Sequence, residues 1–304
     1  MRICLKKVYG MYDKKVFAVQ NERRFFCEKK FWRLTMSETQ SNGQRWENLT
    51  IANNFMFYKI MRNNPDVCKE LLEILLEFPI EKIEMSQEEA IDIDFGSKGV
   101  RLDVYAKDAD GLKIYNIEMQ ASDTKELPER SRYYQGAIDV DILKSGQKYK
   151  DLKTSFVIFI CIDDIFGNGL PKYTFENLCQ ENPKVKLNDR AYKYFFISEN
   201  CDKLLNEDQK AFLRMVTGGK ASNKFTGHVE ELLKNAKRNA QWRKQFMDLE
   251  REKTYAFDRG MEQKTVEAAR SFFANGASIE LIAKSLNMTQ EEVEKIVKDV
   301  AITA

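Results

Sequence analysis

The stretch VRLDVYAKDADGLKIYNIEMQAS, residues 100–122, holds two runs typical of β-strands, joined by a short turn. The DADG segment at 108–111 has turn-forming residues, and its glycine can adopt a positive φ. If Lys107 faces Leu112 across this turn, Asp103 lies opposite Asn116. We therefore expect strands at 100–107 and 112–120 to form an antiparallel hairpin.

The hairpin separates into two chemically different faces, because successive side chains in a strand point to opposite sides. We expect one face to carry Leu102, Val104, Ala106, Tyr115, Ile117 and Met119, and the other to carry Arg101, Asp103, Tyr105, Asn116, Glu118 and Gln120. In this register Asp103 and Glu118 are diagonal neighbours, about 7–8 Å apart at the backbone. Both carboxylates could then reach one metal ion.

The polar face has two possible interpretations. It could be the solvent-facing side of an ordinary hairpin, or it could bind a ligand. The segment SFVIFICID at 155–163 is nearly continuous β-branched and aromatic sequence, which is typical of a strand buried on both faces. Helices would then cover both sides of the sheet, where an unpartnered acidic cluster is costly. This favours a ligand.

The remaining pattern predicts further elements of both kinds. Helices are expected at 48–61, 64–78, 126–143 and 230–253, strands at 90–95 and 191–198, and helices throughout the chain after residue 198. Such an order indicates a mixed sheet with helices on its faces. Asp92 and Asp94 alternate with isoleucines in the strand at 90–95, and either could add a third acid.

Residues 264–300 predict a separate helical unit. A helix stops at Gly276, Ser278 caps a second helix, and Thr289 with Glu292 forms a capping box for the last one. The arrangement resembles a helix-turn-helix, but the acidic last helix would be repelled by phosphate. We favour oligomerisation or packing over DNA reading for this unit.

The overall composition excludes several classes of function. The chain has 304 residues, a net charge of +2, six cysteines without a CxxC pair and a single histidine, His228. Histidine-rich zinc sites are thereby excluded, and a reducing cytoplasm is the simplest compartment. No segment has the roughly 18–20 apolar residues of a membrane span.

Positive charge is concentrated at the N-terminus. Residues 1–35 hold ten of the 49 Lys and Arg residues but three of the 47 acids, so the rest of the chain is slightly acidic. Any nucleic-acid contact should therefore be confined to a cleft. We expect residues 1–43 to be a disordered arm or a mis-started segment, with Met36 as the natural start.

Seven segments together resemble one family. They are LTIANNFMFYKIM, RLDVYAKD, YNIEMQAS, RSRYYQGAIDVDIL, SFVIFICIDDIFG, YTFENLCQENPKVKLNDRAYKYFFIS and AARSFFANGASIELIAKSLNMTQEEVEKI. The chain resembles, over about residues 48–297, the bacterial PD-(D/E)XK family transposases, also called recombination-promoting nucleases. The resemblance implies a restriction-endonuclease-like α/β core with a mixed central sheet, and Mg²⁺-dependent cleavage of DNA, with Mn²⁺ able to substitute.

Roles follow from the resemblance residue by residue. Asp103 and Glu118 would bind the metal, the Met119 backbone carbonyl would complete the site, and Gln120 would orient the attacking water where the superfamily usually has Lys. Asn54 stands where the family usually has a metal-binding Asp. Both amides are uncharged, so the resemblance also implies reduced activity. Apart from the resemblance, Arg130, Arg132 and Tyr134 follow the strand at 112–120 on a helix, where they could contact the DNA backbone or could be helix surface and packing residues.

The sequence predicts three regions after the N-terminal arm and leaves two alternatives to the nuclease function. We expect a nuclease-like domain at 44–200, a helical connector at 201–262 and a helical C-terminal unit at 263–304. One alternative is a weakened nuclease fold that binds nucleic acid or a protein. The other is an interaction protein that forms homo-oligomers through its C-terminal helices.

Overall fold

The computed structural model describes residues 42–86, 90–91, 100–122 and 125–298. The contacts divide the chain between Asn239 and Ala240 into two compact units. The predicted arm at 1–43 lies almost wholly outside the described residues, which begin with helix α2 (Asn42–Glu47). The predicted boundaries at residues 43, 200 and 262 stay predictions, although residue 262 falls within one long helix.

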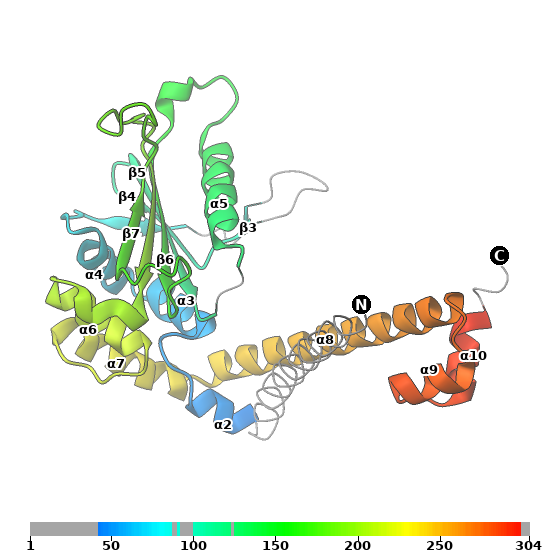
Figure 1. Cartoon of the computed structure of the whole chain (residues 1–304). Coiled ribbons are helices and arrows are strands. Elements are labelled where there is room, and N and C mark those ends of the chain that lie inside the picture. The colour runs from blue at the N-terminus through cyan, green and yellow to red at the C-terminus, as the bar shows by residue number, and fades with distance from the viewer. Residues whose placement is uncertain (1–41, 87–89, 92–99, 123–124, 299–304) are drawn as a thin grey trace, which may run out of the picture. The chain divides into compact units, whose positions relative to one another are not determined.

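The first unit is built on a six-stranded sheet in the order β1-β4-β5-β6-β8-β7 (Figure 1). Its strands are β1 (Ile83–Met85), β4 (Val104–Asp108), β5 (Lys113–Gln120), β6 (Thr154–Cys161), β7 (Lys172–Phe175) and β8 (Ala191–Ile197). The central strands β5, β6 and β8 run parallel, whereas β1, β4 and β7 pair antiparallel with their neighbours. The predicted mixed α/β sheet is confirmed.

Helices cover both faces of this sheet. On one face α5 (Leu127–Ile142) packs Leu127, Ala137 and Ile138 against Val157 and Phe159 of β6. The helices α3 (Asn54–Asn63) and α4 (Pro65–Leu76) lie on the opposite face (Figure 1). As predicted, β6 is buried along its length after its first residue.

Local sequence fixes where these helices start. The Asn53 side chain accepts hydrogen bonds from the amides of Phe55 and Met56, which caps α3. Pro65 occupies the first turn of α4, where its missing N–H costs nothing. Two further helices complete the unit, α6 (Glu207–Val216) and α7 (Lys224–Arg238). The 3-10 turn η2 (Ser198–Lys203) leads from β8 to α6, and a second such turn, η1 (Tyr149–Asp151), lies between α5 and β6.

The predicted register of the hairpin was wrong by two residues. Lys107 pairs with Ile114, not Leu112, and Tyr105 pairs with Asn116. The loop is longer because the Asp108 carboxylate accepts the Lys113 amide at 2.8 Å and Gly111 takes a φ of 63°. A shift of two keeps side-chain parity, so Val104 and Ala106 still share a face with Ile117 and Tyr115 as predicted.

The predicted strand at 100–107 is interrupted. It consists of β3 (Val100–Arg101) and β4, with a bend at Asp103 between them. Because of this break Leu102 packs in the α5-side cluster with Tyr105, so its predicted place on the opposite face was wrong. Of the strand predicted at 90–95, β2 (Ala90–Ile91) is described and pairs with β3, and Asp92 and Asp94 lie outside the described residues.

The predicted helix at 230–253 is also interrupted. The first helix, α7, ends at Arg238, Asn239 has an extended conformation, and α8 (Ala240–Ala274) begins the second unit. In that unit α9 (Ile279–Leu286) and α10 (Gln290–Lys298) pack on the end of α8 through Ala269, Ile282 and Val293.

The predicted caps of the second unit are confirmed. Gly276 has a φ of 85°, and the Ser278 hydroxyl accepts the Leu281 amide at 3.3 Å. Thr289 and Glu292 exchange side-chain to backbone hydrogen bonds of 2.8 and 3.2 Å, which is the predicted capping box. Among the described residues, no helix is both long enough and apolar enough to cross a bilayer.

Candidate functional site

The polar face of β5 is buried beneath α5. Asn116, Glu118 and Gln120 occupy alternate positions of this central strand and are 0%, 2% and 8% exposed. They share this face with Tyr105 and Ile114, which pack in the cluster formed with α5. The interpretation as the wet side of an ordinary hairpin is therefore wrong.

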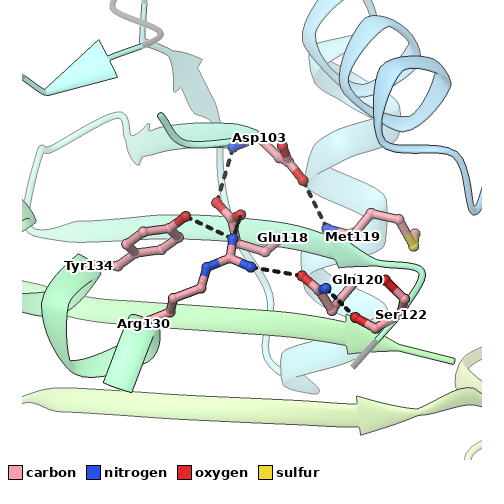
Figure 2. Close-up of polar contacts among 7 residues, drawn as sticks. All are labelled: Asp103, Glu118, Met119, Gln120, Ser122, Arg130 and Tyr134. Atoms are coloured by element: carbon pink, nitrogen blue, oxygen red, sulfur yellow. Dashed lines mark hydrogen bonds and ion pairs between the residues drawn. The ribbon is translucent and has the colours of Figure 1, made fainter. Parts of the chain in front are cut away.

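Two hydrogen bonds join Asp103 to the neighbouring residues Glu118 and Met119 (Figure 2). The Asp103 amide donates to Glu118 Oε1 at 3.1 Å, and the Met119 amide donates to Asp103 Oδ2 at 3.1 Å. The Glu118 carboxylate is thus held by the backbone of Asp103, and the Asp103 carboxylate is held by the backbone of Met119. Extending the observed register by one residue places Asp103 opposite Glu118, closer than the diagonal relation expected from the sequence.

Arg130 of α5 extends into the same site. Its guanidinium donates to Gln120 Oε1 at 3.0 Å and to the Tyr134 hydroxyl at 2.8 Å, and forms an ion pair with Glu118 Oε2 at 3.4 Å. Figure 2 shows it between the side chains of Glu118 and Gln120. The Gln120 Nε2 group donates to the Ser122 carbonyl, so both ends of this amide are held.

The electrostatics of the site disfavour the charged form of Glu118. Burial raises the pKa of Glu118 well above its ordinary value, and the negative charge of Asp103 raises it further. The positive charge of Arg130 opposes this rise without cancelling it. An added cation would relieve the same repulsion.

Asn116 belongs to the site, although sequence reasoning gave it no role. It is fully buried two residues before Glu118, and its side-chain amide helps to lower the pKa of Glu118. Among the described residues neither atom of this amide makes a hydrogen bond of full geometry, so it can accept a further partner such as a water. Its place on the polar face of β5 was the available signal.

Asp103 also borders a small pocket on the side of α3. Tyr58 and Arg62 of α3 line this pocket with Asp103, and the Arg62 guanidinium donates to the Tyr58 hydroxyl at 2.8 Å. Asn54 lies one turn before Tyr58 on the same face of α3, and its side chain is exposed. The structure thus directs the helix face that carries Asn54 toward the side of Asp103.

Comparison with protein families shows which group these residues belong to. A model described as PD-(D/E)XK nuclease family transposase matches residues 52–214, more than half of the chain. The chain belongs to this family. Neither the curated proteins nor the solved structures yielded a match.

PD-(D/E)XK nucleases use divalent metal ions, and the donors of this family member fit such an ion. The adjacent carboxylates of Asp103 and Glu118 are hard oxygen ligands, which Mg²⁺ prefers. A bound Mg²⁺ ion usually keeps several water ligands, so two carboxylates are enough. Within the residues that the structure describes there is no group of three or more His, Cys, Asp or Glu side chains suited to a metal. Any further donor there must be an amide, a backbone carbonyl or water.

The DNA-binding candidates on α5 point in different directions in this PD-(D/E)XK protein. Arg130 and Tyr134, four residues apart, both face the carboxylates. Arg132 lies about half a helical turn away, and its side chain is exposed.

Proposed function

We propose that the chain is a metal-dependent endonuclease that hydrolyses phosphodiester bonds of DNA. The observation that carries this proposal is the pair of neighbouring carboxylates within the segment that matches the family: Glu118 accepts the Asp103 amide at 3.1 Å, and Asp103 accepts the Met119 amide at 3.1 Å. Two neighbouring carboxylates that are fixed by hydrogen bonds and repel each other are suited to bind a divalent cation, because the cation offsets their repulsion.

Each residue has a proposed role. Asp103 and Glu118 hold Mg²⁺, for which Mn²⁺ substitutes, and the Met119 carbonyl and the Asn54 amide oxygen add weaker ligands. When bound, the cation lowers the pKa of a water and stabilises charge on the phosphate. Gln120 orients the attacking water. Arg132 contacts the DNA backbone, and Arg130 and Tyr134 meet DNA only where a phosphate enters the site.

The two amides set the expected strength of the activity. Gln120 and Asn54 bring no charge where a lysine and an aspartate are usual, so we expect slow turnover. This leaves the proposed alternative of a protein with a nuclease fold that binds nucleic acid or a protein partner without cleaving. Plasmid cleavage separates the two proposals.

The test is nicking of supercoiled plasmid by the chain from Met36, with Mg²⁺, Mn²⁺, Ca²⁺ or EDTA. We expect Mg²⁺ and Mn²⁺ to support nicking, and Asp103→Ala and Glu118→Ala to abolish it. Glu230→Gln, which removes an acid from an exposed ion pair with Lys234, is the matched control and should nick normally. Intact plasmid with every metal, and with Asn54→Asp as well, would refute the endonuclease.

The cellular setting is proposed from weaker observations. The family's description as transposases supports a role in DNA recombination or transposition. The four cysteines that the structure describes are free thiols, which supports a reducing cytoplasm. The C-terminal helices are the proposed site of homo-oligomerisation.

A further inference from the structure

The site contains a cation that its sequence motif lacks. The superfamily places Lys where this chain has Gln120, yet a guanidinium contacts both Gln120 and Glu118 from a separate element, α5. A positive charge is therefore present among the proposed catalytic side chains, and it comes from Arg130. The following inference rests on the proposed nuclease function.

Arg130 is held in this position from several sides. The Tyr134 hydroxyl accepts one of its N–H groups at 2.8 Å, and its guanidinium lies over the rings of Tyr134 and Phe159, 5.2 and 5.8 Å from their centroids. Its side chain is 29% exposed, so one edge still reaches solvent. A planar guanidinium fixed in this way keeps its donors aimed with little loss of entropy on use.

We propose that Arg130 is a positioning residue that supplies the positive charge missing from Gln120 and fixes the orientation of the Gln120 amide. By binding Oε1, Arg130 determines that Nε2 points to the Ser122 carbonyl, so the amide cannot flip. Its charge also balances one of the two acids. With a divalent cation the site then has a net positive charge, which suits an anionic phosphodiester.

A purely structural role for Arg130 predicts different behaviour. If Arg130 only tethered Glu118 to α5, its loss would disorder Glu118 and weaken metal binding. If it supplies charge, its loss removes repulsion and tightens metal binding, while cleavage falls. The direction of the change in metal affinity therefore separates the two roles.

The experiment combines Arg130→Gln, Arg130→Lys and the double variant Arg130→Gln/Gln120→Lys, each measured for plasmid nicking and for Mn²⁺ affinity by calorimetry. The double variant moves the charge to the usual lysine position. Arg214→Gln is the matched control, because it removes a guanidinium from an exposed ion pair with Asp202 on another helix. Thermal unfolding checks that every variant is folded.

We expect Arg130→Gln to lose about 100-fold in nicking, as for loss of one charge-stabilising donor, and Arg130→Lys to lose less. The double variant should regain at least about tenfold over Arg130→Gln. Arg130→Gln should bind Mn²⁺ at least about threefold more tightly, and the double variant should return toward wild type. Nicking by Arg130→Gln within threefold of wild type, no recovery in the double variant, or unchanged or weakened Mn²⁺ binding would each overturn the proposal.

A failure of the proposed nuclease function would look different. In that case the wild-type chain itself would not nick, and the Mn²⁺ titrations alone would decide the role of Arg130. Tighter binding by Arg130→Gln, reversed in the double variant, would still place its charge at the metal site. Unchanged or weaker binding would overturn the assignment.

Discussion

At the scale of single residues, the site places charge where the fold disfavours it. Glu118 is 2% exposed and lies beside Asp103, whose negative charge repels its own, and Arg130 is its ion-pair partner. A Glu118→Gln substitution would keep an oxygen for the Asp103 amide and would remove the repulsion between the two neighbouring carboxylates. Function and stability are therefore in conflict at this position.

We predict that Glu118→Gln raises the stability of the metal-free chain by about 1–2 kcal/mol, while it abolishes cleavage. The reason is the removal of a buried like charge with retention of the hydrogen bond to Asp103. Denaturant unfolding in EDTA is the measurement, and Glu230→Gln should stay within about 0.5 kcal/mol of wild type. A clear destabilisation by Glu118→Gln would show that its ion pair with Arg130 outweighs the repulsion.

The sequence predicted the acids of the site but not their cation. Asp103, Glu118 and Gln120 follow from alternation along a strand and from the family resemblance, both of which are local. The contact of Arg130 with them depends on how α5 packs across the sheet, which no pattern within the helix encodes. The place of the Asn116 amide in the site likewise becomes visible only when burial is known.

At the scale of elements, side chains also organise loops. Asp164, just after β6, accepts hydrogen bonds from the amides of Gly169 at 2.7 Å and Phe166 at 3.1 Å, and from the Tyr173 hydroxyl at 2.9 Å. Burial alone would raise the pKa of Asp164, but these hydrogen bonds outweigh it and lower the pKa. Its carboxylate thus ties the start of this loop to β7.

We predict that Asp164→Asn destabilises the chain by about 1–2 kcal/mol at pH 7, because the amide replaces one charged acceptor with a donor. Since the pKa is lowered on folding, the contribution of Asp164 is present above about pH 4 and is lost as pH falls toward the folded value. Denaturation at pH 7 and pH 3 should show the difference shrinking. The neighbouring exposed Asp163→Asn is the control, and an equal effect from it would contradict the prediction.

A second element-scale prediction concerns the end of α6. The Gly219 amide donates to the Arg214 carbonyl at 2.8 Å, and a Cβ on Gly219 would lie 2.8 Å from that same oxygen. Gly219→Ala should therefore cost about 1–3 kcal/mol in unfolding free energy. Gly136→Ala in α5, where the added carbon would meet nothing within 4 Å apart from the adjacent backbone of the helix itself, should have little effect or be slightly stabilising.

Elements were predictable where the sequence carried a clear pattern. The periodic helix α4 and the apolar run of β6 were recognised, whereas the longest helix, α8 (Ala240–Ala274), was predicted as parts of two separate helices. The short strands β1 and β7, with three and four residues, are too short to show a period. The break between α7 and α8 falls at Asn239, without a glycine or proline to mark it, so one helix was predicted where there are two.

At the scale of the whole molecule, the chain consists of two compact units divided at Asn239. The unit before Ala240 includes all of the proposed site residues and nearly all of the buried aromatic side chains. The second unit has a small core of its own around Val293 and Ile282.

We predict that a chain ending at Asn239 folds cooperatively and retains Mg²⁺-dependent nicking, because the site lies wholly before the division. If the C-terminal helices mediate self-association, as we propose, this shortened chain should form a smaller oligomer than the full chain does. Light scattering, which measures the molar mass of the oligomer, checks this. Val293→Asp in the full chain, which buries a charge in the core of the second unit, should reproduce that loss. The same assembly size in all three would exclude this region as the oligomer interface.

The loop between β4 and β5 has a consequence beyond closing a hairpin. Because faces repeat every two residues, a loop longer or shorter by two would preserve the apolar and polar sides and leave the fold intact. The partner of Asp103 would nevertheless change: its amide would lose the bond to Glu118, and its carboxylate would lose the bond from the Met119 amide. The length of this loop therefore decides which residue lies opposite Asp103 without changing how well the sheet packs. Related chains with the same acids would differ in activity if this loop differed in length.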